Sequence, residues 1–345
     1  MFTRLFGGKA GAAERSARLA RAANLLAPSA GKPSFAEAVP GQVMVAFHAH
    51  AEADGLTGNF LTAVTRGLSS SGQRELVLTL RLGDREQPIA KMQELLRFFT
   101  TVSSWAEAGN IVNEGGVTQF GERGLFGQAQ CGLLYTDARA IVGVELPERA
   151  LAAIFVRAPE LQAALDYGVY RVLTRIGAQL RLFPFPTWGA LDRPSVITSG
   201  ESESSLAKVQ RMRVPGASFV VSGKRVCLRL PAKANLAPAL NSLPAAAPFA
   251  LLMRPAPDAD AVLTWRPGQR ETTGISPGGT DGSRLSGCFM MFASNVGGDE
   301  ARPLEDGYSL LLSSEPRTRL LSALREQIPL ALALGTSQRL ELEWE

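Results

Sequence analysis

One stretch near the middle of the chain decides the fold: Arg171-Val172-Leu173-Thr174-Arg175-Ile176-Gly177-Ala178-Gln179-Leu180-Arg181-Leu182-Phe183-Pro184-Phe185-Pro186. Its first half carries apolar residues at helical spacing, and Gly177 predicts the end of that helix because glycine is favoured at C-caps. The prolines at 184 and 186 are compatible with neither a helix nor a central strand. The stretch therefore predicts a buried helix followed by a rigid, extended segment where two layers of a domain meet.

The size and composition of the chain indicate an ordinary globular protein. A chain of 345 residues is long enough for two domains, or for one domain and an appendage. There is no run of about 18 apolar residues, so we expect no membrane span. Cys131, Cys227 and Cys288 lie far apart and mostly in apolar runs, which predicts buried, reduced thiols in the cytoplasm.

The positive charge is concentrated at the N-terminus. Residues 1–40 contain six basic and two acidic side chains, so their net charge is +4, which equals that of the whole chain. The remaining residues sum to zero. Because binding to phosphates needs clustered Lys and Arg on a folded surface, the composition predicts that this protein does not bind nucleic acid.

Residues 1–40 are predicted to form a basic helical leader and a linker. Residues 10–26 have helical periodicity, with Arg15, Arg18 and Arg21 largely off the apolar side, and residues 27–40 are rich in Pro, Ser, Gly and Ala. The leader could touch an acidic partner or, through residues 1–26, make peripheral contact with an anionic membrane. The alternative is a tail without a fixed role, because an apolar face made mostly of Ala adds little membrane affinity.

The body of the chain predicts an α+β fold with two subdomains, residues 41–198 and 206–345, in which helices pack on mixed or antiparallel sheets. In the first subdomain we expect strands at 43–50, 60–65, 75–82, 131–135 and 140–144, an amphipathic helix at 88–105, short helical or irregular segments at 147–155 and 159–167, and a glycine-rich loop at 113–127.

The second subdomain is predicted to contain two successive ββαββ units. The expected strands are 217–221, 225–230, 249–253 and 261–265, then 287–292, 307–312, 330–334 and 339–344; the expected helices are 234–243 and 315–327. Residues 267–284 have no apolar period and are expected to form a long, mobile polar loop.

His48 and His50 are the only histidines, and residues two apart in a strand share a face. Together with Glu52 and Asp54 just beyond, they are candidate metal ligands. The alternative is a solvated strand face, because two histidines fall short of the four ligands that a closed site usually has.

Several motifs resemble those of one known family. They are Gly72-Gln73-Arg74-Glu75-Leu76-Val77, Ala108-Gly109-Asn110, Gly132-Leu133-Leu134-Tyr135, the stretch from Arg175 to Pro186, Gly287-Cys288-Phe289-Met290-Met291-Phe292 with Glu305-Asp306-Gly307, and the helix Leu321-Ser322-Ala323-Leu324-Arg325-Glu326-Gln327. In this order they resemble the C-terminal domain of SARA and endofin, the FYVE-finger endosomal scaffolds, over residues 43–345. The composition, rich in Ala, Arg and Gly, is typical of a high-GC bacterial version.

The resemblance implies a binding module for which we know no reaction. Its most specific residues, which we expect at a seam between layers, are Arg175, Gly177, Arg181, Phe183, Pro184 and Pro186. The chain has no Cys-rich zinc finger and no Smad-binding segment, so lipid recognition and Smad recruitment do not transfer. A lesser similarity is to Suppressor-of-fused-type domains, which are also α+β adaptors.

The search for catalytic motifs gives the same expectation. There is no Gly-x-Ser-x-Gly elbow, no His-Glu-x-x-His, no Cys-x-x-Cys and no dinucleotide-binding glycine motif. Arg175 and Arg181 could bind an acidic ligand or make structural pairs at the seam. The sequence predicts a cytoplasmic, non-catalytic adaptor without a cofactor that binds another protein. The alternatives are an immunity or chaperone-like partner of a toxin or effector, and a metal-dependent enzyme that uses His48 and His50.

Overall fold

The computed structural model describes residues 32–51, 58–83, 86–141, 143–198, 205–244, 246–266, 272–336 and 338–345. The predicted leader helix with Arg15, Arg18 and Arg21 lies outside these ranges, as do Glu52 and Asp54. No helix in the described part of the chain has the length and apolar character needed to cross a membrane.

The chain divides into two compact units. Of the described residues, those from 32 to 165 and from 186 to 197 form the N-terminal unit, and those from 166 to 185 and from 198 to 345 form the C-terminal unit. The domain limits 41–198 and 206–345 stay predictions. The α+β class is confirmed, since the described residues form five α helices and three sheets that each contain parallel and antiparallel pairs.

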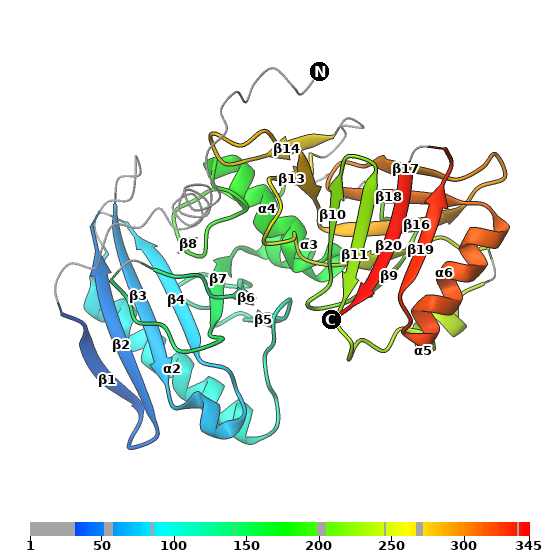
Figure 1. The fold of residues 1–345 in the computed structure, drawn as a ribbon. Coiled ribbons are helices and arrows are strands. Elements are labelled where there is room, and N and C mark those ends of the chain that lie inside the picture. The colour runs from blue at the N-terminus through cyan, green and yellow to red at the C-terminus, as the bar shows by residue number, and fades with distance from the viewer. Residues whose placement is uncertain are drawn as a thin grey trace. The chain divides into compact units, whose positions relative to one another are not determined.

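The N-terminal unit is an eight-stranded sheet in the order β1-β2-β3-β4-β7-β6-β5, with β8 also paired to β4. Its elements are β1 (Ser34–Val39), β2 (Val43–His50), β3 (Asn59–Arg66), the 3₁₀ turn η1 (Leu68–Ser71), β4 (Leu76–Leu82), α2 (Pro88–Glu107), β5 (Val117–Gln119), β6 (Gly132–Asp137), β7 (Leu151–Val156), α3 (Ala158–Tyr167) and β8 (Gly189–Ala190). In Figure 1, α2 lies along one face of β1 to β4.

The core of this unit lies between α2 and the sheet. Leu95, Phe99 and Val102 of α2 pack with Val45 and Leu78 from the strands, and all five are buried. The spacing of three and four residues places the α2 side chains on one face, as the sequence predicted. The predicted hairpin is also confirmed, because β3 and β4 pair antiparallel.

Four expectations for the N-terminal unit are wrong. The linker contains β1, the glycine-rich loop contains β5, and residues 151–156 form β7 rather than a helix. Residues 140–144 form only an isolated bridge between Ile141 and Val144. β7 was missed because it is buried on both faces, and a continuous apolar run has no period that separates strand from helix.

The C-terminal unit holds the other two sheets. Its elements are α4 (Val169–Leu180), β9 (Gln210–Arg213), β10 (Ser218–Ser222), β11 (Arg225–Leu230), α5 (Ala237–Asn241), β12 (Phe249–Leu252), β13 (Ala261–Thr264), β14 (Thr273–Ile275), β15 (Arg284–Ser286), β16 (Phe289–Ser294), β17 (Glu300–Pro303), β18 (Gly307–Leu312), α6 (Ser314–Glu326), β19 (Leu330–Leu334) and β20 (Gln338–Trp344). One sheet has the order β14-β13-β15-β10-β11-β20-β19, and the other has the order β17-β18-β16-β12-β9.

These two sheets enclose one apolar core, and α6 closes its side (Figure 1). Phe219 of β10, Leu340 of β20, Phe292 of β16 and Leu324 of α6 are all buried in it. The predicted ββαββ duplication is not confirmed. Strands from the two expected repeats pair with each other, β11 with β20 and β12 with β16. The expected loop at 267–284 contains β14 and the start of β15.

The deciding stretch forms α4 and the segment after it. The helix continues past Gly177 and ends at Arg181, whose φ of 57° is left-handed, so the predicted glycine C-cap is wrong. A Cβ atom at Gly177 would lie 2.3 Å from the carbonyl oxygen of Pro184 and 2.6 Å from that of Leu182. The glycine is therefore needed because the extended segment returns against the helix, not because the helix ends there.

Candidate functional site

Three stretches quoted from the sequence, residues 171–186, 287–292 and 305–307, meet in the C-terminal unit. Arg171 of α4 lies 3.1 Å from Asp306 (Nε to Oδ2) and 3.3 Å from Glu305 (to Oε1). The Cys288 amide donates to the Asp306 carbonyl over 2.7 Å, and the Cys288 sulfur lies 3.4 Å from the Thr174 hydroxyl. Residues far apart in the sequence thus form one buried polar cluster at the start of β16 and β18.

Aromatic rings extend this cluster. The guanidinium carbon of Arg171 lies 3.8 Å from the centroid of Trp265 and 5.2 Å from that of Tyr167. Arg175 lies 4.6 Å from the Trp265 centroid, and Arg211 lies 5.0 Å from the Tyr167 centroid. Cations and rings therefore alternate in the order Arg211, Tyr167, Arg171, Trp265, Arg175. Such contacts are strongest where they are shielded from water, as they are at Arg171 and Trp265.

Burial dominates the electrostatics of this cluster. It raises the pKa of Asp306 to about 7, although the Arg171 charge acts in the opposite direction. Burial also raises the pKa of the Cys288 thiol, so this sulfur is held in its protonated form. Residues 287–292 and 305–307 approach closely, since a Cβ at Gly307 would lie 2.4 Å from the Phe289 carbonyl oxygen. The cluster is built to join elements and is closed to solvent.

The expected seam residues have different environments. Arg175 is half-buried against Trp265, whereas Arg181 is exposed at the end of α4. Phe183 and Pro186 are buried, and the peptide bond between Phe183 and Pro184 is cis. One of the three boundaries between the units in the described residues falls between residues 185 and 186. The seam role of these residues stays a prediction.

His48 and His50 share a face of β2, as predicted, but the expectation of a solvated face is wrong. They are 6% and 2% exposed, and their ring centroids are 6.5 Å apart. Burial, followed by the nearby His50 and Arg66, lowers the pKa of His48. Within the described ranges, no group of three or more His, Cys, Asp or Glu side chains could hold a metal ion.

A separate crevice lies in the N-terminal unit, with a volume of about 570 Å³. It is lined by Arg66, Gly67, Ser69, Gly72, Gln73, Arg74, Glu75, Pro147, Glu148 and Arg149. The first motif of the family resemblance, Gly72 to Val77, supplies four of these residues. The crevice therefore forms where the connection from β3 to β4 meets the segment before β7.

Hydrogen bonds hold the crevice floor in place. The buried Glu75 carboxylate accepts from the Thr65 hydroxyl (2.7 Å) and from the amides of Gly67 (2.8 Å) and Ser69 (3.1 Å). The Gln73 side chain donates to the Val112 carbonyl and accepts from its amide. Because each of these buried polar side chains has partners, the turn is fixed in one conformation.

The three arginines of the crevice differ in their partners. Arg74 pairs with Asp137 at 2.8 Å and donates to the carbonyls of Arg149 and Ala150. Arg66 lies 3.4 Å from Glu145, in a pair whose side chains are 46% and 87% exposed. The Arg149 side chain is exposed and makes no hydrogen bond or ion pair in the described ranges. Of the three, Arg149 is thus the cation most open to a ligand.

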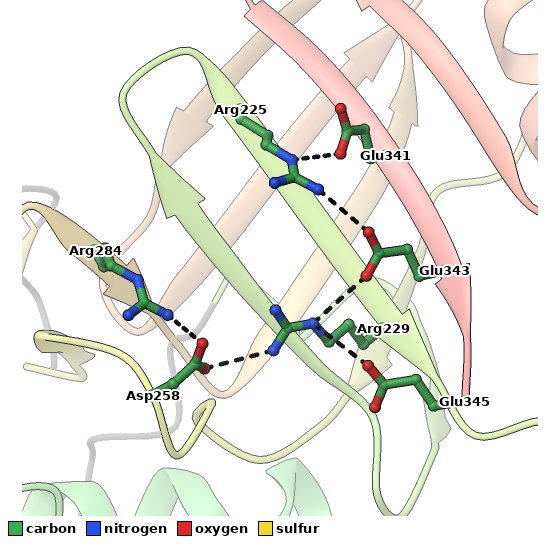
Figure 2. A network of polar contacts seen from close by, with 7 residues as sticks. All are labelled: Arg225, Arg229, Asp258, Arg284, Glu341, Glu343 and Glu345. Atoms are coloured by element: carbon green, nitrogen blue, oxygen red, sulfur yellow. Dashed lines mark hydrogen bonds and ion pairs between the residues drawn. The ribbon is translucent and has the colours of Figure 1, made fainter. Parts of the chain in front are cut away.

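A third polar feature is the charged outer face of β11 and β20, shown in Figure 2. Arg229 lies 3.5 Å from Asp258, 3.6 Å from Glu343 and 3.6 Å from Glu345. Arg225 pairs with Glu341 and Glu343, and Arg284 pairs with Asp258. This is a solvated network of both signs, as expected for an outward-facing strand surface.

Sequence reasoning missed Arg66, Glu148 and Arg149. These residues belong to no recognised motif, and 66 and 149 are brought together only by the pairing of β4 with β7. The one feature of the sequence that could have indicated the crevice was the motif Gly72 to Val77. It was quoted for the family resemblance, but no binding site was predicted from it.

Neither a family model nor a curated protein sequence matches this chain. The resemblance to SARA and endofin therefore has no support from these comparisons. Among solved structures, the crystal structure of Drosophila Suppressor of Fused is similar with 10% sequence identity and a TM-score of 0.37, covering 87% of this chain and 88% of that chain. A likeness of this size is distant, and no functional argument rests on it.

Proposed function

We propose that this chain is a non-catalytic cytoplasmic adaptor that binds another protein through the crevice of the N-terminal unit. The observation that supports this is a crevice whose floor is held by hydrogen bonds and whose rim carries exposed charges of both signs. Glu148 and Arg149 are adjacent and exposed, and neither side chain makes a hydrogen bond or ion pair in the described part of the chain.

The fixed floor matters because of what binding costs. A partner must offset the ordering of side chains and loops at an interface, and a preformed surface reduces that cost. Glu75 and Gln73 already hold the turn, so only the exposed side chains remain to be ordered. An open crevice with opposite charges at its rim suits a segment of protein that presents both charge and backbone polar groups.

The sequence motifs agree with this proposal. Those that resemble the SARA and endofin domain imply a scaffold, and Gly72 to Glu75 lies directly in the crevice. The cytoplasmic assignment is supported by the three cysteines, which are buried and free. The basic leader would add affinity for an acidic partner.

Site-specific photo-crosslinking tests the proposal. A benzoylphenylalanine in place of Glu148 should trap one discrete partner protein on illumination in the cells that express the chain. The same residue in place of Glu315, which is 79% exposed on α6, is the matched control and should not trap that protein.

Equal labelling from both positions, or no labelled protein from position 148, would remove the crevice as the binding site. The identity of the trapped protein also separates an adaptor from an immunity or chaperone-like role. A toxin or secreted effector at this position would favour the latter.

A further inference from the structure

Strand β19 has an open edge. It is the last strand of the seven-stranded sheet and pairs antiparallel with β20 from Leu330 to Leu334. In the described part of the chain, its backbone makes no hydrogen bond to any other element. The outward-facing amides and carbonyls of this strand are therefore available for one more strand.

The other edge strands of the two sheets in the C-terminal unit, β14, β17 and β9, are short or protected, and β19 is not. β17 carries Glu300 and Arg302 and ends in Pro303, while β9 carries the exposed Arg211 and Arg213. Charges and prolines on an edge prevent unwanted strand pairing. β14 is only three residues long. In contrast, β19 has five residues with neither charge nor proline.

The sequence of β19, Leu330-Ala331-Leu332-Ala333-Leu334, reads the same in both directions. In an antiparallel pair centred on Leu332, position 330 faces 334 and 331 faces 333. Opposed residues of antiparallel strands lie on the same face of the sheet. Leucine therefore meets leucine on the inner face and alanine meets alanine on the outer face, which is the self-complementarity that a two-fold dimer needs.

We propose that two copies of this chain associate by antiparallel pairing of their β19 strands about Leu332. The surroundings fit a second copy. Ile328, which is 46% exposed, precedes the strand and supplies apolar area, and Trp344 donates to the Ile328 carbonyl. The exposed charged side chains of α6 are Glu315, Arg319, Arg325 and Glu326, two of each sign, so two α6 helices can approach with complementary partners.

This association is independent of the adaptor role. It extends the sheet across two chains, and it gives each particle two crevices. A bivalent adaptor binds a partner with repeated sites more tightly than a single chain does, without any new contact.

The register of the dimer gives a sharp test by sedimentation velocity over a range of protein concentrations. The unmodified chain should show a monomer–dimer equilibrium with a Kd on the order of micromolar, as expected for a small interface. Ala331→Lys with Ala333→Lys places lysine opposite lysine twice, and should weaken the dimer about tenfold or more.

A charge-paired variant keeps the test falsifiable. Ala331→Lys with Ala333→Glu places lysine opposite glutamate twice in the proposed register and should restore the dimer. Within the chain these residues face Glu341 and Arg339 of β20, so the variant has no internal conflict.

A control carries the same added charge elsewhere. Ala129→Lys with Ala232→Lys changes two exposed alanines and should leave the equilibrium unchanged. Far-UV circular dichroism checks that every variant is folded. A chain that stays monomeric at roughly 100 micromolar, well above the expected Kd, would overturn the proposal. So would a charge-paired variant that associates no better than the double-lysine variant. Neither result would change the crosslinking expected at position 148, because the adaptor role does not depend on the dimer.

Discussion

Each unit buries one arginine with a carboxylate, and the two pairs are built differently. In the N-terminal unit, both oxygens of Glu160 accept from Arg193, at 2.7 and 2.8 Å, and also from the amides of Val196 (2.8 Å) and Arg157 (3.1 Å). In the C-terminal unit, Asp306 lies 3.1 Å from Arg171, yet neither of its oxygens accepts a well-aligned hydrogen bond in the described ranges.

The difference shows what offsets the cost of burying charge. A buried ion pair stabilises a protein only when good geometry and further hydrogen bonds compensate for lost hydration. Glu160 has that compensation. Asp306 does not, and its pKa rises to about 7, so a proton can replace the charge. In the C-terminal unit, Arg171 also lies against the rings of Trp265 and Tyr167, at 3.8 and 5.2 Å from their centroids.

The largest effect is expected at Arg193. Arg193→Met leaves Glu160 buried with only backbone donors, and should lower the free energy of unfolding by about 3–5 kcal/mol. Urea unfolding followed by tryptophan fluorescence measures it. Arg66→Met is the control from the same unit, because the exposed pair with Glu145 should contribute less than about 1 kcal/mol. Equal losses in both variants would mean that the compensation argument is wrong.

For Arg171→Met we expect a smaller decrease in the free energy of unfolding than for Arg193→Met. Methionine keeps apolar contact with Trp265 and Tyr167, and Asp306 can take up a proton once the guanidinium is gone. We expect the free energy of unfolding to fall by about 1–2 kcal/mol at pH 6 and by more at pH 8. At pH 8 protons are scarcer, and Asp306, left beside Glu305 without the guanidinium, binds its proton less readily. A loss as large as that of Arg193→Met, without pH dependence, would contradict the comparison.

The sequence could predict the parts of this fold that depend on local periodicity. The apolar residues of α2 recur every three or four positions. Residues 75–82 alternate over much of their length and follow a polar, glycine-containing spacer, so both the helix and the hairpin of β3 and β4 were predicted correctly. Gly177 was misread because a glycine required by the return of a distant segment has the same local signature as a C-cap. β7 was misread because burial on both faces removes alternation.

The polar clusters were harder to predict, because their partners are far apart in sequence. Arg171 and Asp306 lie in separate stretches of the sequence, and nothing local in either indicates that they pair. His48 and His50 were placed on one face correctly. Their burial was missed, because it depends on what covers that face of the sheet and not on the residues of β2 itself.

The stability of the folded chain should depend on pH through Asp306. The pKa of Asp306 is higher in the folded protein than in an unfolded chain. At any pH between these two pKa values, the folded state therefore binds a proton at Asp306 that the unfolded state has released. The stabilisation from that proton is complete below the unfolded pKa and is lost as pH rises through about 7. The unmodified chain should therefore lose stability from pH 5 to 7 relative to Asp306→Asn, by at most about 1.4 kcal/mol per pH unit.

The difference in stability between the unmodified chain and Asp306→Asn separates the effect of Asp306 from that of His48. The protonation of His48 changes stability with pH in the opposite direction. The lowered pKa of His48 makes stability fall as pH drops below the ordinary histidine value. His48 is present in both chains and cancels. Parallel stability curves for the unmodified chain and Asp306→Asn would show that Asp306 keeps its charge throughout.

The smallest effect is expected in the exposed network of Figure 2, where the ion pairs are solvated and not buried. Arg229 has three carboxylates within 3.6 Å, more charged partners than Arg193 has, yet water surrounds them. Arg229→Met should therefore cost no more than about 1 kcal/mol, and the cost should vanish in high salt because exposed charges are screened. Urea unfolding at low and high ionic strength measures both. If Arg229→Met costs as much as Arg193→Met at either salt concentration, the number of partners would decide stability, and not their burial and hydrogen bonding.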